Sequence, residues 1–384
     1  MNPEKAAIDC LQKLVQQPSV SGNEKGVVEA AGAEMRSLGF DEVWTDETGN
    51  VIGLIKGHKP GKRILFDAHV DVVNATTPEN WNRPPFSGEF ADGRIWGRGS
   101  TDNKGSLSAM MAGLSALPRE EISGSIYVVG SVGEETLEGI GHAQTVDALK
   151  PDYVVIGEPT DCRIGFGQRG RARLIFRVPG SAGHSSADDQ TGNAVYAMAR
   201  LIARLEGQSF PHDPLLGDAI QAPIELMSNP YPSLSTVPVE CKLAVDRRLL
   251  LGETEESVVS DYQKRIGGLP DATVEMDVVT YASYTGKQFK VSDFHPAWVT
   301  GADSAFLKGC LAGVNAAGLP AVSYPIPYCT NGSYCAGVLG IPTIVFGPGS
   351  ILQAHAMNEF LEVKELHKAL RCYQEITRKV LSLG

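Results

Sequence analysis

The sequence lacks any apolar run that approaches the roughly 20 residues a helix needs to cross a bilayer. Its first residues lead into an amphipathic pattern rather than an apolar signal core. Cysteine is scarce as well: the seven cysteines are an odd number and form no CxxC pair, which is typical of reduced thiols and argues against a disulfide scaffold. We therefore expect a cytoplasmic protein with no membrane partner.

Positive charge is also in short supply. The 34 lysines and arginines are outnumbered by 45 aspartates and glutamates, which gives a formal net charge of -11. No basic stripe is interleaved with aromatic residues, so a nucleic-acid partner is excluded. No internal repeat or low-complexity segment occurs, and the composition is that of an ordinary globular protein. A chain of 384 residues exceeds what one core normally holds, so two domains are expected.

The hydrophobic pattern predicts an α/β fold in which an α+β domain interrupts a larger one. Short β-rich runs alternate with helical stretches outside the middle of the chain, which favours a mixed, largely parallel sheet covered by helices. The middle segment instead predicts the order β-α-β-β-α-β, with no metal-type side chains at its strand ends. The expected strands are at residues 171–178, 224–228, 237–249 and 272–281, and the expected helices are at residues 193–205 and 253–266. We expect a catalytic domain at residues 1–168 and 288–384 and an inserted domain at residues 169–287.

Polar side chains follow the predicted strands of the larger domain, where sites in α/β sheets collect. Each has a simpler explanation when taken alone: a solvated strand end, a helix cap, an acidic turn or a loop histidine. Together they supply what a two-metal hydrolytic site needs, namely one carboxylate to share, further N and O ligands, and a spare carboxylate to deprotonate water. The candidates are His69, Asp71, Asp102, Glu134, Glu135, Glu158 and His355.

Three features of these motifs suit that chemistry. His69 and Asp71 point to the same face of an extended segment, so Asp71 can orient the imidazole. Asp102 lies in a glycine-rich turn that can hold a carboxylate between two ions. Of the adjacent pair Glu134 and Glu135, one can bind metal while the other stays free as a base. The alternative for Asp102 is a helix N-cap.

In combination these motifs resemble the co-catalytic zinc amidohydrolases, a group that includes acetylornithine deacetylase, succinyl-diaminopimelate desuccinylase, carboxypeptidase G and aminoacylase. The resemblance covers nearly the whole chain, and the segment from Thr330 to Gly349 is most similar to a branch linked to selenium metabolism. It implies two Zn²⁺ ions, for which Co²⁺ or Mn²⁺ could substitute. The motifs that carry it are His69-x-Asp71, Gly97-Arg98-Gly99-x-x-Asp102-x-Lys104-Gly105, Glu134-Glu135, Gly157-Glu158-Pro159-Thr160 and Gly183-His184-Ser185-Ser186.

The resemblance also implies a role for each residue. Asp102 would bridge both ions, with His69 and Glu158 completing one and Glu135 and His355 the other. Glu134 would be the general base and Asp71 would orient His69. In the inserted domain, His184 would reach the partner subunit's site and stabilise the oxyanion, which implies a homodimer; a plain turn histidine is the alternative.

Substrate contacts are less sharply defined by the sequence. Asn193 and Arg248 match positions that hold a substrate carboxylate in relatives, although Arg247 is an equally charged neighbour. The segment Cys329-Thr330-Asn331-Gly332 stands where deacetylase and desuccinylase relatives carry a Thr-Ser-Asp type segment. We therefore expect substrate contact from Thr330, Asn331 and Gly332 without an assignment of the acyl group.

The sequence thus predicts a di-zinc hydrolase that cleaves the amide bond of a small N-acyl amino acid or a short peptide. One alternative is a dipeptidase or carboxypeptidase. The other is a non-catalytic metal-binding relative, against which the spare carboxylate Glu134 argues, because a protein that only binds metal needs no base.

Overall fold

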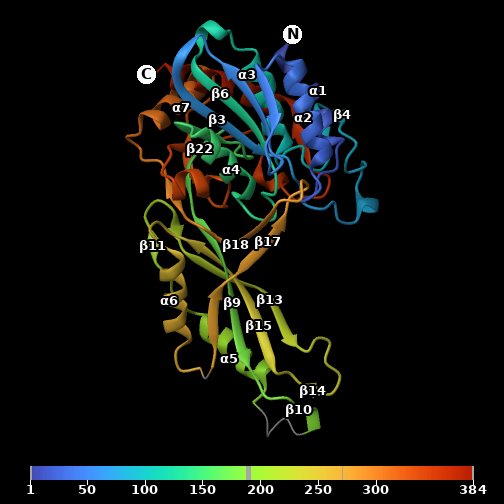
Figure 1. Ribbon diagram of the computed structural model, residues 1–384, viewed down its shortest axis with the longest axis vertical. Helices are drawn as coiled ribbons and strands as arrows, with labels where there is room; N and C mark the ends of the chain where they lie inside the picture. Colours follow the sequence, from blue (N-terminus) through green and yellow to red (C-terminus); the bar gives the residue numbers. More distant parts are fainter. Residues whose placement is uncertain (1, 187–191, 270, 383–384) are drawn as a thin grey trace. The chain divides into compact units, whose positions relative to one another are not determined.

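The computed structural model describes residues 2–186, 192–269 and 271–382. The chain divides into two compact units (Figure 1). Unit 1 comprises Met1–Gln168, Thr280–Phe289 and Val299–Gly384, and unit 2 comprises Arg169–Val279 and Lys290–Trp298. Of the helices in the described ranges, none is both long and apolar enough to cross a membrane.

Unit 1 is built on a mixed sheet. Strand β3 runs parallel to both β6 and β7, and β7 runs parallel to β22, whereas β1 with β2, β2 with β6, and β22 with β8 are antiparallel. The sheet order is β1 (Glu42–Thr45), β2 (Val51–Lys56), β6 (Ser123–Ser131), β3 (Lys59–His69), β7 (Tyr153–Ile156), β22 (Thr343–Val345), β8 (Ile164–Gln168) and β20 (Trp298–Val299), with β21 (Ser323–Ile326) beside β8. This arrangement confirms the predicted largely parallel sheet.

The α-helices of unit 1 pack around this sheet (Figure 1). Helix α3 is buried along almost its whole length and packs against α1 and α8, while α2 packs on β1 and β2. Local signals set the helix starts: Asn2 caps α1 by accepting from the backbone N–H groups of Glu4 and Lys5, with Pro3 in the first turn. The helices are α1 (Pro3–Val15), α2 (Lys25–Ser37), α3 (Lys104–Ser115), α4 (Ile140–Leu149), α7 (Ala305–Ala316) and α8 (Val363–Leu381).

Unit 2 has one antiparallel sheet and two helices with a core of its own. Phe176 and Tyr262 stack edge to face at the centre of this core, at 5.3 Å between ring centroids. The main elements confirm the predicted β-α-β-β-α-β order. They are β9 (Gly170–Pro179), α5 (Ala194–Leu205), β13 (Ile220–Asn229), β15 (Glu240–Leu249), α6 (Glu255–Ile266) and β16 (Thr273–Met276), and the sheet order is β13-β15-β9-β16.

Two predicted strands of this unit are broken in the structure. The expected strand at residues 237–249 divides into β14 (Thr236–Val237) and β15, because Pro238 has no N–H to donate to a ladder. The expected strand at residues 272–281 divides at Asp277 into β16 and β17 (Val278–Ala282). Asp277 is held by the backbone of Arg173 and Asp293, and β17 then pairs with β18 (Gln288–Ser292) in a separate sheet.

The turn between β17 and β18 groups with unit 1, so the chain passes between the units more often than a single insertion requires. Hydrogen bonds from this turn, and from Tyr281 in the adjoining strand β17, to unit 1 explain this grouping. The hydroxyl of Tyr281 donates to Glu24, that of Tyr284 to the carbonyl of Gly49, and that of Thr285 to the carbonyl of Glu47.

Candidate metal centre

The register of three parallel strands brings the predicted ligands of unit 1 together. His69, the last residue of β3, is paired with Ser131, the last residue of β6, and Asp67 of β3 is paired with Ile156 at the end of β7. The loops that leave β6 and β7 therefore start at the same edge as His69. Glu134 lies three residues beyond β6, and Glu158 lies two residues beyond β7.

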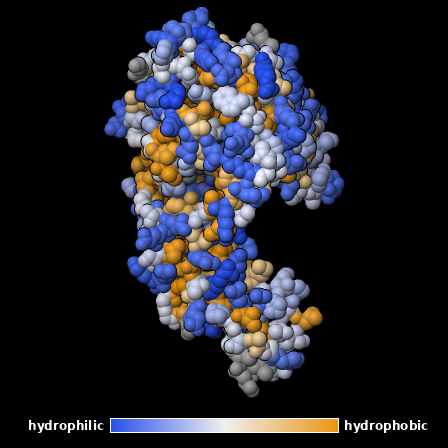
Figure 2. Space-filling view, viewed as in Figure 1, coloured by the Kyte–Doolittle hydropathy of each residue, from blue (hydrophilic) through white to orange (hydrophobic). Residues whose placement is uncertain are grey.

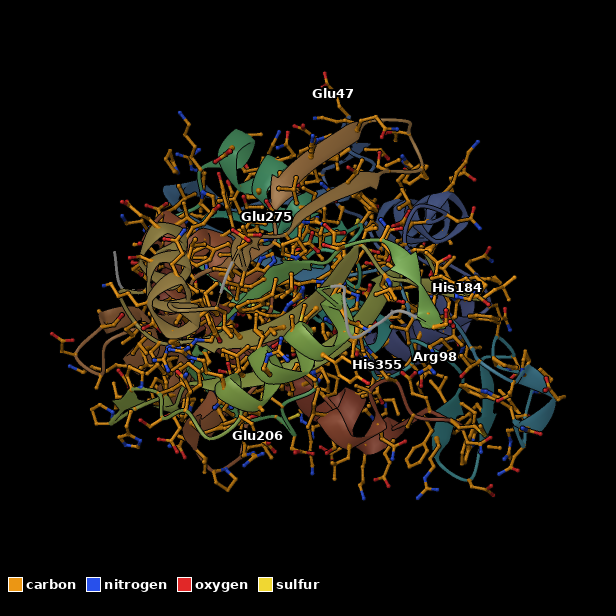
Figure 3. The ribbon with its side chains drawn as sticks, turned by 90° about the horizontal axis from the view of Figure 1, so that it is seen from below. Glu47, Arg98, His184, Glu206, Glu275 and His355 are labelled. Atoms are coloured by element: carbon orange, nitrogen blue, oxygen red, sulfur yellow. The ribbon has the colours of Figure 1, made fainter. Side chains whose placement is uncertain are left out.

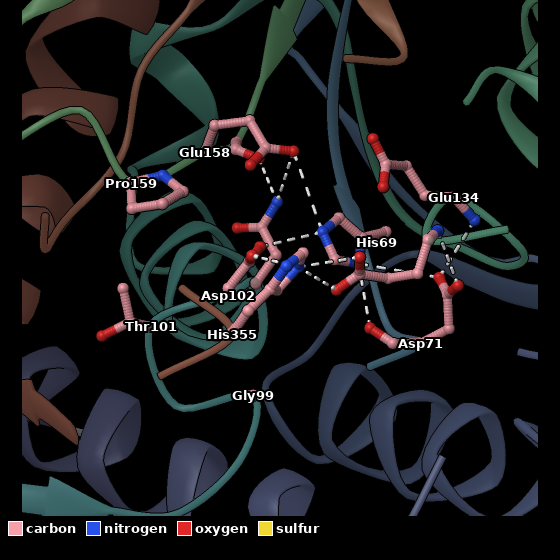
Figure 4. A network of polar contacts seen from close by, with 12 residues as sticks. His69, Asp71, Gly99, Thr101, Asp102, Glu134, Glu158, Pro159 and His355 are labelled. Atoms are coloured by element: carbon pink, nitrogen blue, oxygen red, sulfur yellow. Dashed lines mark hydrogen bonds and ion pairs between the residues drawn. The ribbon is translucent and has the colours of Figure 1, made fainter. Parts of the chain in front are cut away.

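His69 is buried and points its Nε2 atom at two carboxylates (Figure 4). This atom lies 3.1 Å from Asp102 Oδ1 and 3.8 Å from Glu158 Oε1. The other ring nitrogen, Nδ1, lies 2.9 Å from the backbone carbonyl oxygen of Asp71. Donation from Nδ1 to this carbonyl leaves the Nε2 lone pair directed at the carboxylates, which is the tautomer that a metal ligand requires.

Asp71 contributes to the site differently from the sequence expectation. Its carboxylate is 3.6 Å from His69, too long for a hydrogen bond, and accepts instead from the backbone N–H groups of Glu134 at 3.2 Å and Glu135 at 3.0 Å. The hydroxyl of Ser21 donates to it at 2.7 Å. Asp71 thus orients His69 through its carbonyl and fixes the glutamate turn through its carboxylate.

Asp102 lies between the two histidines. Its Oδ1 faces His69, and its Oδ2 is 3.5 Å from Nε2 of His355. It is not the helix cap, because Asn103 occupies the cap position of α3. A carboxylate that directs each oxygen at a different imidazole has the geometry needed to bridge two ions.

The remaining candidates complete the cluster on either side of Asp102. Nε2 of His355 lies 3.0 Å from Glu135 Oε2, and the His355 side chain is 55% exposed, so this side of the cluster is open. Glu158 accepts from the side-chain amide of Asn103 at 3.1 Å. One ligand atom each from His69, Asp102 and Glu135 lie within 4.8 Å of one another.

Glu134 is buried beside this cluster. Its backbone is fixed by Asp71, whereas its carboxylate has no hydrogen-bond partner among the described residues. Burial raises the pKa of Glu134 well above its usual value; His69 opposes the shift and Glu158 adds to it. A buried carboxylate with a raised pKa and no bonding partner is the kind of group that serves as a general base near neutral pH.

The electrostatics of the cluster fit a bound cation. Burial, reinforced by Asp102, raises the pKa of Glu158 well above its usual value, and burial also raises that of Glu135 despite its bond to His355. Burial opposes protonation of His69, but Glu134, Asp102 and Asp71 still raise its pKa. Crowded carboxylates in a low-dielectric site favour divalent cations, and N and O donors without thiolate suit catalytic Zn²⁺, Co²⁺ or Mn²⁺.

These shifts predict that the chelator-treated protein loses stability as pH rises. In the folded state the buried Glu134, Glu158 and His69, whose pKa values are raised, bind protons that the unfolded chain releases, above pH 4.5 for the glutamates and above pH 6.5 for the histidine. The free energy of unfolding should fall by about 1.4 kcal/mol per pH unit for each such proton. Urea unfolding at about pH 5.5 and pH 8 measures this slope, which saturating zinc should reduce. A free energy of unfolding that rises with pH in the chelator-treated protein would contradict the conclusion that carboxylates are crowded in this cluster.

The predicted site residues of the inserted segment all lie in unit 2. His184 is exposed on the short strand β10 (Gly183–His184), and its Nδ1 is 2.9 Å from the hydroxyl of Ser186. Asn193 caps α5 by accepting from Val195. Arg248 lies on β15 with its Nε 3.1 Å from Asp246, and its role, like that of His184 and Asn193, stays a prediction.

The Thr330–Gly332 segment is buried in unit 1. The hydroxyl of Thr330 donates to Gln168 at 2.7 Å. The amide of Asn331 donates to Asp67 at 2.8 Å and to Ser131 at 3.2 Å, and accepts from the backbone of Gly139. These bonds give the two side chains an internal role, and substrate contact by this segment stays a prediction.

The sequence analysis missed two residues that form hydrogen bonds to members of the cluster. Glu359 is fully buried and accepts the backbone N–H of Asp102, and Asn103 donates to Glu158. Asn103 follows a candidate ligand directly, and this adjacency was the available signal. Glu359 follows His355 by four residues in a loop, where no periodicity points to a side chain.

Comparison with known proteins places these motifs in a family. A model of Peptidase family M20/M25/M40 matches residues 65–379. The uncharacterised protein YgeY of Escherichia coli strain K12 is 34% identical over 362 residues, which cover 91% of this chain and 88% of that protein. Succinyl-diaminopimelate desuccinylase of Cereibacter sphaeroides is 29% identical over 293 residues, which cover 72% of this chain and 76% of that protein.

A solved structure supports the fold independently. The YXEP protein of Bacillus subtilis, described as a dinuclear metal-binding peptidase from the M20 family, matches with a TM-score of 0.69 at 15% identity. The match covers 100% of this chain and 99% of that chain. The family match spans the described ligand cluster and most of the sequence, so this chain is a member of Peptidase family M20/M25/M40, as its motifs predicted.

Proposed function

We propose that this protein is a metal-dependent hydrolase that cleaves the amide bond of an N-acyl amino acid or a short peptide. The observation that carries the proposal is the position of Asp102, with one oxygen toward His69 and the other toward His355, beside the uncommitted carboxylate of Glu134. A shared carboxylate and a separate base are the two parts that distinguish a hydrolytic two-metal site from a single structural ion.

The proposed ligand set divides the cluster between two Zn²⁺ ions. His69 and Glu158 would hold one ion, Glu135 and His355 would hold the other, and Asp102 would serve both. When bound, the ions polarise the amide carbonyl and make water more acidic. The side chain of His355 is half exposed, so the cluster is open to solvent beside this residue, where a substrate can approach.

Glu134 performs the proton transfers in this proposal. It removes a proton from the attacking water and delivers it to the nitrogen of the leaving amine. A carboxylate whose pKa is raised by burial accepts a proton more readily than an exposed one, and the acid so formed then donates that proton to the amine. The bonds from the Glu134 and Glu135 backbone to Asp71 fix the turn that carries this group.

Unit 2 supplies the proposed substrate contacts. We assign the oxyanion to His184 and the substrate carboxylate to Arg248 and Asn193. Arg248 is favoured over Arg247 by their surroundings. Arg247 is buried, paired with Glu253 at 2.8 Å and stacked 4.2 Å from the ring of Phe210, whereas the Arg248 side chain is 30% exposed.

The name of one relative, a desuccinylase, favours N-acyl amino acids as substrates, and the peptidase description of a structural neighbour favours peptides. A panel of N-acyl amino acids, dipeptides and carboxyl-terminal peptide substrates, assayed with zinc and with cobalt, separates these activities. We expect release of the free amino acid from at least one N-acyl amino acid. Activity on dipeptides alone would assign a dipeptidase, and none on the whole panel would favour a non-catalytic metal-binding protein.

We further propose that two chains associate through unit 2. Strand β13 is an edge of its sheet and carries exposed apolar residues. An unpaired strand edge with exposed apolar side chains is a ready surface for pairing with a second copy. Figure 2 shows apolar side chains on the surface of this unit, and the exposed apolar residues of β13 are Ile220, Ile224, Leu226 and Met227.

If His184 completes the neighbouring chain's site, two inactive variants should restore activity together. In a mixture of His184→Ala and Glu134→Gln chains, each mixed dimer contains one site with both defects and one with neither. We expect up to about half of the mixed dimer's sites to regain normal turnover, measured after subunit exchange is demonstrated with differently tagged chains. Exchange without any recovery would show that His184 does not act across the dimer.

A further inference from the structure

The carboxylate of Glu359 is fully buried and accepts four hydrogen bonds. Its Oε2 accepts from Arg98 Nη1 at 2.6 Å and from the backbone N–H of Gly99 at 3.0 Å. Its Oε1 accepts from the backbone N–H groups of Thr101 at 2.9 Å and Asp102 at 3.0 Å. One side chain therefore organises the loop that carries the central carboxylate of the cluster.

Arg98 extends this organisation to a second ligand. While Nη1 is paired with Glu359, Nη2 donates to the backbone carbonyl of His355 at 3.3 Å. Figure 3 labels Arg98 and His355 close together, and the guanidinium group also lies 5.2 Å from the ring of Trp81. The side chain of Arg98 is 3% exposed, so these contacts are formed out of water.

The backbone of the loop from Gly99 to Asp102 is confined to its observed conformation. Gly99 has a φ of 86°, in the left-handed region, and an added Cβ would lie 2.7 Å from Val72 and 3.1 Å from Lys104. The four bonds to Glu359 and this confinement together define where Asp102 stands. The bond from Arg98 to the carbonyl of His355 defines where that histidine stands relative to Asp102.

We propose that Glu359 and Arg98 are a positioning pair that sets the separation of Asp102 and His355 and so determines the affinity for the ion held by Asp102, Glu135 and His355. This inference rests on the proposed ligand set. The pair touches neither His69 nor Glu158 in the contacts above. Asp102 serves both ions in the proposed set, but the pair also holds the backbone carbonyl of His355, which is a ligand of only one of them. Loss of the pair should therefore weaken the ion held by His355 more than the other.

Glutamine, although similar in size, should not replace Glu359, because all four of its hydrogen bonds require an acceptor. Glutamine has the size of glutamate but replaces one oxygen by an NH₂ group. This group would meet either the N–H groups of Thr101 and Asp102 or those of Arg98 and Gly99, and donors cannot bond donors. Two buried N–H groups would lose their acceptor, so the loop must shift to satisfy them.

The test measures zinc binding rather than catalysis. Metal-free wild type, Glu359→Gln and Arg98→Met are titrated with zinc in competition with a chromophoric chelator. Wild type should show two sites. Both variants should bind the ion held by Asp102, Glu135 and His355 about 10–100-fold more weakly, the usual effect of losing a group that orients a metal ligand. The affinity for the ion held by His69 and Glu158 should fall less. Excess zinc should restore the second ion.

Matched controls come from two strands that pair with each other and lie next to the proposed pair in the sequence. Arg94 on β5 (Arg94–Trp96) pairs with Glu362 on β23 (Phe360–Glu362) at 3.5 Å, four and three residues from the proposed pair, without contacting either ligand loop. Arg94→Met and Glu362→Gln should bind both ions as wild type does. Circular dichroism and the unfolding midpoint of each metal-free variant report on folding.

Two results would decide against the pair, and a third would decide against the metal centre on which it rests. Unchanged affinities in both variants would overturn its role, and so would equal weakening of both ions together with a lower metal-free unfolding midpoint, which a general structural defect predicts. If Glu359→Gln does not fold, Arg98→Met decides alone. A wild type that binds no zinc would overturn the proposed metal centre itself, which the titration distinguishes because the failure is then present without any substitution.

Discussion

Replacing Glu134 by glutamine is expected to leave both metal ions bound and to lower turnover by about 10²–10⁴-fold or more. Glutamine keeps the size of the side chain but cannot accept a proton from water. The backbone bonds to Asp71 do not involve the substituted group, so the glutamate turn should keep its place. Steady-state kinetics on the best substrate, together with metal analysis of the same sample, measure both effects.

Glu362→Gln is the control for this prediction, since it removes a carboxylate on β23 outside the cluster and should keep normal turnover. The role of Glu134 as the base is untenable if Glu134→Gln retains near-normal turnover. Loss of metal along with activity would instead make Glu134 a ligand.

The second large effect is expected at Asp102. Asp102→Ala should bind neither ion firmly and should lose measurable activity, because one side chain faces both imidazoles. Asp102→Asn offers a finer test. It keeps the shape of the side chain but presents one oxygen, so it should hold at most one ion tightly. Inductively coupled plasma analysis after gel filtration counts the ions in each variant.

Two ions bound per chain in Asp102→Ala would refute the bridging role. The metal-free Asp102→Ala protein should also lose part of the repulsion within the cluster, since Asp102 helps to raise the pKa values of Glu158 and Glu135. Its unfolding midpoint, measured in the presence of chelator and compared with that of the wild type, shows whether the variant has lost only its metal or also its folded stability.

The sequence predicted those parts of the fold that depend on local pattern. The buried run that ends at His69 predicts a central parallel strand. The candidate ligands that follow strand ends come together because the register of β3 with β6 and β7 aligns those ends. The family was also predicted from the order of its motifs and is confirmed by the match over residues 65–379.

Other features depend on contacts between distant segments, which a pattern does not contain. The spacing of His69 and Asp71 correctly put both on one face, yet it could not tell that the carbonyl of Asp71 would meet the imidazole while its carboxylate bound the glutamate turn. Glu359 is joined to Asp102 across 257 residues of sequence. The break at Asp277 likewise follows from its bonds to Arg173 and Asp293, which only the folded chain brings near.

The Thr330–Gly332 segment illustrates a further limit. Its departure from the pattern of relatives drew attention to the substrate, but the amide of Asn331 is bonded inside unit 1 to Asp67 and Ser131. A difference from the sequences of relatives identifies a position that has changed. It does not tell whether the side chain at that position contacts a ligand or the protein core.

Zinc titration of the metal-free protein during turnover tests the central claim most directly. The protein is stripped with chelator, and hydrolysis of its best N-acyl amino acid is followed as zinc is added in known equivalents. The account predicts no hydrolysis without metal and a rate that reaches its plateau at two zinc ions per chain. Hydrolysis that persists in the stripped protein, or a chain loaded with two zinc ions that cleaves no amide, would contradict a two-metal amide hydrolase.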